Sequence, residues 1–219
     1  MDKIALITGA SRGLGASLAE LLADTHHVIA VGRTVGGLEA LDDRIQAKGG
    51  AATLAPMDIK IPEAMEQLAG SIAQRWGKID LWCHTAVNAP HQAPADHIDP
   101  KESKDAIPVN FEAVMRLIPL FSPLLKASPE GHAVFFKDTT QPDHFFGLYG
   151  STKAAQIALA QSWKAETERV GPRVSILEPR RMNTSVRGRF YPGGNKDDVV
   201  SPMDEAQRLL PDVLTPKPI

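Results

Sequence analysis

The chain has 219 residues, of which 43% are hydrophobic, and its net charge is −2. This length suits one domain with a well-buried core and is short for two ordinary domains. No apolar run approaches the ~20 residues of a membrane helix, the N-terminus lacks a signal-peptide layout, and acidic and basic residues are interspersed. We therefore expect a cytoplasmic protein with no nucleic-acid or membrane partner. The single cysteine, Cys83, excludes an internal disulfide and offers no metal cluster.

The N-terminal stretch predicts a nucleotide site between a strand and a helix. Residues 4–7 are an apolar run of strand formers, residues 8–15 contain three glycines, and a helical leucine pattern follows. Such a turn exposes backbone N–H groups at a helix N-terminus, which suits a diphosphate, and glycine lets the phosphates approach. A plain turn is the alternative. The loop residues expected to contact the nucleotide are Gly9, Ser11, Arg12, Gly13, Leu14 and Gly15.

The second strand, expected at residues 27–32, ends at Arg33. In dinucleotide-binding folds an acid at this position binds the ribose hydroxyls, whereas an arginine suits a 2′-phosphate. Arg12 in the glycine loop can join Arg33 in forked, charge-assisted hydrogen bonds to that phosphate. The predicted cofactor is therefore NADP rather than NAD, and the alternative is that Arg33 is an ordinary surface arginine.

Strands and helices alternate along the rest of the chain. This alternation predicts an α/β fold: a doubly wound, Rossmann-type parallel sheet in a three-layer α/β/α arrangement, as a single NAD(P)-binding domain over residues 1–219. Three prolines in residues 211–219 argue against a seventh strand, so we expect six strands. The further strands are expected at 51–55, 79–84, 133–136 and 173–177, and further helices at 38–48 and 62–75.

Two long helices and a lid are expected in the second half. Residues 110–126 carry too many apolar positions for one helix face, and Pro119 and Pro123 are expected to bend or end that helix. The helix after residue 149 is also rich in small and apolar residues. The polar, glycine-containing stretch at 183–200 is predicted to be a mobile substrate lid, and a short helix is expected to start at Ser201.

Tyr149 and Lys153 are spaced four residues apart, which places them on one helix face. Tyrosine has an ordinary pKa near ~10, and a neighbouring ammonium favours its ionised form. Such a pair can exchange a proton with a substrate oxygen. The spacing also arises on solvated helix faces, so its meaning depends on the nucleotide site upstream.

Taken together, these motifs resemble the short-chain dehydrogenase/reductase family over roughly residues 4–210. The resemblance implies hydride transfer that interconverts a small-molecule carbonyl and an alcohol, in a homodimer formed through the two long helices. It makes Tyr149 the proton donor and gives Lys153 the tasks of holding the nicotinamide ribose and lowering the tyrosine pKa. It assigns Asn110 to a water-filled proton path that reaches the lysine. Further cofactor contacts are implied for Asp58, Ile59, Thr85, Ala86, Pro179, Met182 and Thr184.

The sequence departs from the family pattern where a catalytic serine should follow the fifth strand. Asp138 falls in that position, and Thr139 comes next. An ionised aspartate has no proton to donate and repels an oxyanion, whereas a threonine carries the required hydroxyl. Two readings remain open: Thr139 takes the place of the serine, or the protein binds a dinucleotide with little or no catalysis, as a redox sensor or interaction partner.

Overall fold

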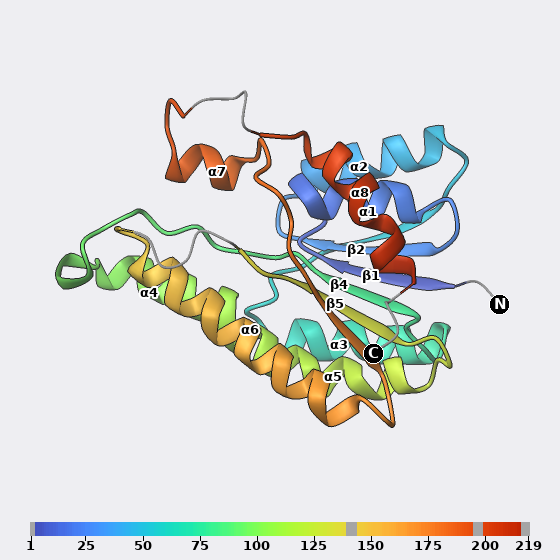
Figure 1. Ribbon diagram of the computed structural model, residues 1–219. Helices are drawn as coiled ribbons and strands as arrows, with labels where there is room; N and C mark the ends of the chain where they lie inside the picture. Colours follow the sequence, from blue (N-terminus) through green and yellow to red (C-terminus); the bar gives the residue numbers. More distant parts are fainter. Residues whose placement is uncertain (1–2, 139–143, 195–198, 216–219) are drawn as a thin grey trace.

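The computed structural model describes residues 3–138, 144–194 and 199–215 (Figure 1). Their six strands form one parallel sheet in the order β3-β2-β1-β4-β5-β6, which is the predicted doubly wound arrangement. The strands are β1 (Ile4–Thr8), β2 (His27–Gly32), β3 (Ala52–Pro56), β4 (Leu81–His84), β5 (His132–Phe136) and β6 (Arg173–Leu177). The α-helices are α1 (Gly13–Leu22), α2 (Val35–Ala47), α3 (Pro62–Arg75), α4 (Pro100–Ile107), α5 (Ala113–Lys126), α6 (Gly147–Thr167), α7 (Ser185–Phe190) and α8 (Pro202–Leu214).

Helices cover both faces of the sheet (Figure 1). Alternate residues of a strand point to opposite faces, so Ile4 and Leu6 of β1 pack with α3, α5 and α6, whereas Ala5 and Ile7 pack with α1, α2 and α8. Every residue of β1 is buried. An apolar strand that is buried on both faces is typical of the centre of a parallel sheet.

Helix α5 continues through both of its prolines, so the expectation that they end the helix is wrong. Pro119 and Pro123 lie inside the helix and, like Met115, are exposed. These positions are spaced four residues apart and share the outer face, so the carbonyls left without a helical N–H partner lie on the solvent side. The loss of hydrogen bonds is therefore cheaper there than on the buried face.

Asn110 lies outside regular α-helix. It sits in a π-helical turn, Pro108–Glu112, that joins α4 to α5, and the Ala113 N–H bonds to the Pro108 carbonyl five residues back. Such turns inside a longer helix leave a backbone carbonyl available to another partner. The carbonyl of Asn110 is used in this way, as the site shows.

Two other helices are longer than predicted. Helix α2 begins at Val35 rather than residue 38, and its first turn contains Gly36 and Gly37. A glycine is required at position 37, since a Cβ there would come within 2.6 Å of the Ser11 carbonyl oxygen. Helix α8, expected only as a short helix starting at Ser201, runs through the exposed Pro211 to Leu214. The predicted lid region contains α7 and a short β-bridge, while residues 195–198 lie outside the described ranges.

Candidate active site

A cavity lies at the carboxyl ends of the strands, where the strand order reverses between β1 and β4. Doubly wound sheets bind their ligands at this position. Each strand contributes a following loop, and α6 contributes its first two turns. The structure brings all the residues expected to contact a cofactor to the wall of this one cavity. They are Gly9, Ser11, Arg12, Gly13, Leu14, Gly15, Arg33, Asp58, Ile59, Thr85, Ala86, Tyr149, Lys153, Pro179, Met182 and Thr184.

The glycine loop is shaped by contacts that exclude a side chain. Gly9 has a φ of +92°, and a Cβ there would lie 2.5 Å from the Ala86 nitrogen. A Cβ on Gly15 would lie 2.3 Å from the Gly9 carbonyl oxygen. The loop therefore packs directly on the end of β4 and leaves the N-terminus of α1 at the cavity. Backbone N–H groups in this arrangement suit the diphosphate of a dinucleotide.

The β2 and β3 end of the cavity carries both an arginine and a carboxylate. Arg33 Nη1 lies 3.8 Å from Asp58 Oδ2, and the Arg33 side chain is 52% exposed. Asp58 Oδ1 accepts a hydrogen bond from the Lys60 backbone N–H at 2.9 Å. Arg12 lines the same cavity. The guanidinium groups of Arg12 and Arg33 suit a phosphate group at this end of the cavity. The hydrogen bond from Lys60 fixes the orientation of Asp58 beside them.

Tyr149 is buried, with 4% of its surface exposed, and its ring packs on Phe146 and Phe190 with the Phe190 centroid at 4.7 Å. The Tyr149 hydroxyl donates a hydrogen bond to Asp138 Oδ2 at 2.8 Å. Burial, together with the negative charge and the hydrogen bond of Asp138, raises the pKa of Tyr149 well above its ordinary value. The expected lowering of this pKa by Lys153 is therefore wrong, because a carboxylate is the partner of the hydroxyl.

Lys153 is held below the tyrosine by two acceptors. Its Nζ donates to the Phe136 carbonyl at 2.9 Å and to Gln156 Oε1 at 2.5 Å. Burial lowers the pKa of Lys153 to about 8, although Asp138 opposes that shift. These two hydrogen bonds fix the position and orientation of the Lys153 ammonium at the cavity wall.

Asn110 connects to this lysine through a side chain that the sequence analysis missed. The Gln156 amide donates to the Asn110 carbonyl at 2.8 Å and its oxygen accepts from Lys153, so Gln156 links the two residues directly. The Asn110 side chain is used elsewhere: it accepts from the Asn88 N–H at 2.7 Å and donates to Thr152. Gln156 is fully buried. A polar residue three positions after Lys153, in an otherwise small and apolar stretch, was the available signal.

His84, at the end of β4, is a cavity residue that the sequence analysis missed. Its Nδ1 lies 2.8 Å from Thr8 Oγ1, whereas its buried Nε2 has no hydrogen-bond partner among the described residues. Burial and the nearby charge of Lys153 lower the pKa of His84 to about 3. The imidazole is therefore neutral at physiological pH.

Asp138, the residue that the sequence places where a serine was expected, lies at the cavity beside Tyr149. Asp138 follows β5 by two residues, lines the cavity and contacts Tyr149. Thr139, the predicted substitute, lies outside the described residues. The expectation that the Thr139 hydroxyl takes the place of the serine therefore rests on the sequence alone.

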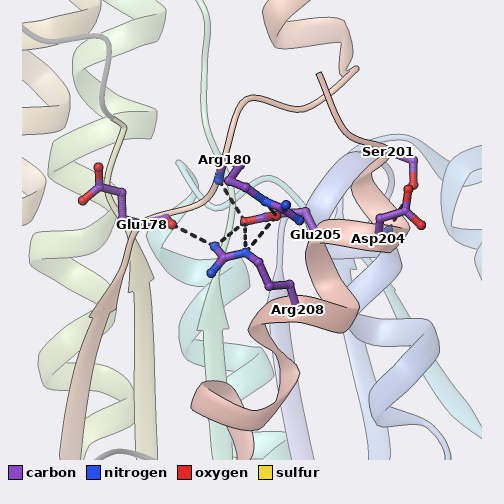
Figure 2. Close-up of polar contacts among 6 residues, drawn as sticks. All are labelled: Glu178, Arg180, Ser201, Asp204, Glu205 and Arg208. Atoms are coloured by element: carbon purple, nitrogen blue, oxygen red, sulfur yellow. Dashed lines mark hydrogen bonds and ion pairs between the residues drawn. The ribbon is translucent and has the colours of Figure 1, made fainter. Parts of the chain in front are cut away.

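The cavity wall after β6 is tied to the C-terminal helix by a buried carboxylate. Figure 2 shows Glu205 of α8 between Arg180 and Arg208. Glu205 is fully buried and accepts from the Arg180 backbone N–H at 2.8 Å, from Arg180 Nε at 2.7 Å and from Arg208 Nη2 at 2.5 Å. Burial alone would raise the pKa of Glu205, but hydrogen bonds from Arg208 and Arg180 outweigh it and lower the pKa to about 2. Arg180 is therefore anchored to α8 by Glu205, although half of its side chain is exposed.

The described residues offer neither a metal cluster nor a membrane-spanning helix. No group of three His, Cys, Asp or Glu side chains in those ranges could hold a metal ion. None of the helices in the described ranges is both long and apolar enough to span a bilayer.

Comparisons with known proteins give one consistent result. A family profile described as short chain dehydrogenase matches residues 3–193. Benzil reductase ((S)-benzoin forming) of Saccharomyces cerevisiae is 32% identical over 198 residues, covering 85% of this chain and 74% of that protein. The 1-deoxy-11-beta-hydroxypentalenate dehydrogenase of Streptomyces avermitilis is 29% identical over 211 residues, covering 92% and 77%.

Solved structures agree with the sequence comparisons. An alcohol dehydrogenase from the archaeon Thermococcus sibiricus, complexed with 5-hydroxy-NADP, superposes with a TM-score of 0.85 at 26% identity, covering 99% of this chain and 92% of that chain. A metagenomic short-chain oxidoreductase in complex with NADP superposes with a TM-score of 0.83 at 25% identity, covering 97% and 91%.

Proposed function

The chain belongs to the short-chain dehydrogenase family, and on that premise we propose that it is an NADP(H)-preferring oxidoreductase that interconverts a small-molecule carbonyl and an alcohol. The observation that carries the proposal is the shared cavity: Tyr149 and Lys153 face the same space as the glycine loop and Arg33. A proton-transfer pair thus adjoins a dinucleotide-shaped site. Relatives and structural neighbours named as reductases and alcohol dehydrogenases, some bound to NADP, support this reading.

The cavity residues divide into groups that would hold different parts of the cofactor. The N–H groups of residues 11–15 would bind the diphosphate, Arg12 and Arg33 the 2′-phosphate, and Asp58 the adenine. Residues 179–184 and Lys153 would hold the nicotinamide half. When bound, the nicotinamide cofactor donates or accepts the hydride. The protein supplies orientation and the proton.

Tyr149 would protonate the substrate oxygen during reduction. Its raised pKa keeps the hydroxyl protonated at neutral pH, which is the form needed in that direction. Phe146 and Phe190 pack around the ring, and Val87, Ala89, Val186 and Tyr191 pack on the same cluster. This apolar wall favours substrates with hydrophobic groups next to the carbonyl.

The test is a panel of aldehydes and ketones, aromatic ketones and diketones included, assayed by the loss of NADPH absorbance. We expect turnover with NADPH to exceed turnover with NADH, and Tyr149→Phe to lower kcat at least ~100-fold. Cofactor affinity of the variant, measured by NADPH fluorescence, should stay near the wild-type value because the lost hydroxyl points at Asp138. Unchanged turnover in the variant would overturn the assigned role of Tyr149.

A non-catalytic dinucleotide-binding protein is the second candidate, and the Asp138–Tyr149 hydrogen bond favours it. A carboxylate beside the tyrosine opposes the negative charge that develops on a carbonyl oxygen. This candidate predicts tight NADP(H) binding with no turnover across the panel. Replacing Asp138 by serine would then be expected to create measurable reduction.

We also propose a homodimer formed through α5 and α6. Met115 of α5 is 50% exposed, and Ala154 and Ala158 present small side chains on the outer face of α6. Small residues on an exposed helix face allow close approach of a second helix. Light scattering at micromolar concentration should give twice the monomer mass of 23.6 kDa.

A further inference from the structure

The two hydrogen-bonded routes that lead to the catalytic pair differ in what they can carry. On one side, Lys153 donates to Gln156, and Gln156 donates to the Asn110 carbonyl. Gln156 and Asn110 are fully buried. A primary amide keeps its protons at neutral pH, and a backbone carbonyl has none to pass on. This route therefore positions the lysine without carrying a proton to solvent.

On the other side, Tyr149 donates directly to a carboxylate. The acceptor is Asp138 Oδ2 at 2.8 Å, and Asp138 is partly exposed while Tyr149 is buried. A carboxylate can take up a proton and release it to water. Asp138 thus stands between the buried hydroxyl and the solvent-accessible part of the cavity.

We propose, resting on the proposed function, that Asp138 is the group through which Tyr149 exchanges its proton with solvent. In alcohol oxidation the substrate O–H proton moves to the Tyr149 oxygen while the Tyr149 proton moves to Asp138 Oδ2. The hydride leaves the carbinol carbon with its electron pair for the oxidised nicotinamide, and the carbonyl forms from the electrons of the O–H bond. Asp138 then releases its proton to water, and reduction runs the same steps in reverse.

This relay removes the need for a stable tyrosinate. The pKa of Tyr149 is raised, so an anion on its oxygen is unfavourable next to Asp138. Concerted transfer through the tyrosine makes the carboxylate the effective base. Asp138 touches no reacting atom and acts through Tyr149, so it is a positioning and relay residue rather than a catalytic one.

Charged or titratable groups on several elements lie near Asp138 in the described ranges. Lys153 lies below it on α6, and His84 lies beside that lysine at the end of β4. Lys137, the preceding residue, is ion-paired with Glu178 after β6. Burial holds His84 neutral and lowers the pKa of Lys153 to about 8, so a transition due to Lys153 would appear near that pH.

The first test compares the pH dependence of alcohol oxidation in the wild type and Asp138→Asn. With the relay intact, kcat should be nearly constant through neutral pH. The asparagine variant should lose about 100-fold at neutral pH and recover as pH rises, because Tyr149 must then ionise by itself. Asp138→Glu should keep the wild-type profile. Glu178→Gln, which removes a neighbouring carboxylate with no contact to Tyr149, is the control and should also keep it.

The second test reads the tyrosine without turnover. In a Tyr191→Phe background Tyr149 is the sole tyrosine, since the chain has two. Its ionisation can be followed by ultraviolet absorbance, with circular dichroism to show that the fold persists. Adding Asp138→Asn should make Tyr149 ionise at a lower pH than in the background protein, which tests the Asp138–Tyr149 contact that the relay requires even if no substrate in the panel is converted. An unchanged tyrosine titration, or an unchanged kcat profile in Asp138→Asn, would overturn the relay; absence of wild-type turnover would instead overturn the proposed function.

Discussion

The two ends of the cavity are built in different ways. The glycine-loop end depends on backbone packing, because a Cβ on Gly9 or Gly15 would meet protein atoms at 2.5 or 2.3 Å. The tyrosine end depends on side-chain hydrogen bonds, among them Tyr149 to Asp138 and Lys153 to Gln156. Where the backbone must pack closely, the sequence shows the constraint directly as glycine. Where side chains form the site, the Tyr149 and Lys153 motif can be present in the sequence although a neighbouring residue, here Asp138, changes what the tyrosine contacts.

The largest effect that would sharpen this comparison is expected from Gly15→Ala. The added methyl would collide with the Gly9 carbonyl oxygen and with Thr85 Oγ1, both at 2.3 Å, so the loop must move away from β4. We expect a loss of about 3 kcal/mol in the free energy of unfolding and no detectable NADPH binding. Gly36→Ala, with no atom within 4 Å of its Cβ, is the matched control. Chemical denaturation and NADPH fluorescence measure both effects, and wild-type binding in Gly15→Ala would contradict the backbone account.

At the tyrosine end, the buried ammonium of Lys153 should make the free energy of unfolding depend on pH. Burial lowers the Lys153 pKa from 10.5 to about 8, so between these values the unfolded chain binds more protons than the folded one. The free energy of unfolding should therefore rise as pH increases from about 8 to 10.5, by up to ~3 kcal/mol. Lys153→Met should show a smaller rise. Urea denaturation at several pH values gives the comparison, and equal slopes would show that Lys153 is solvated.

The smallest effect is expected from Arg33→Ala at the rim of the cavity. Its guanidinium is half-exposed and partly engaged by Asp58, so we expect about a tenfold loss in affinity for NADPH and little change for NADH. Arg169→Ala, an exposed arginine that does not line the cavity, serves as control. Equal losses for both cofactors would remove Arg33 from phosphate recognition.

The sequence predicted those parts of the molecule that follow from local patterns. Apolar runs located all six strands, and the run at residues 62–75 matched α3 at both ends. The glycine loop, Arg33 and Asp58 also met at one cavity as expected. These features depend on strand periodicity and on the topology of parallel sheets, which place the strand ends side by side.

The missed features depend on contacts between distant segments. Gln156 binds the Asn110 carbonyl only because a π-helical turn presents that carbonyl to α6. The Tyr149–Asp138 bond depends on the path between β5 and α6, for which the sequence gives no rule. Proline was read as a helix breaker at Pro119, but exposure on the outer face made it tolerable.

Helix α8 contacts two segments that line the cavity. Its Ala206 and Leu209 share a core cluster with Leu14 and Leu18 of α1, and its Glu205 accepts hydrogen bonds from Arg180 after β6. We therefore expect docking of this helix and occupancy of the cavity to be thermodynamically linked. A bound dinucleotide should slow amide hydrogen exchange along α8, so the last helix of the chain becomes a reporter of whether the cavity is filled.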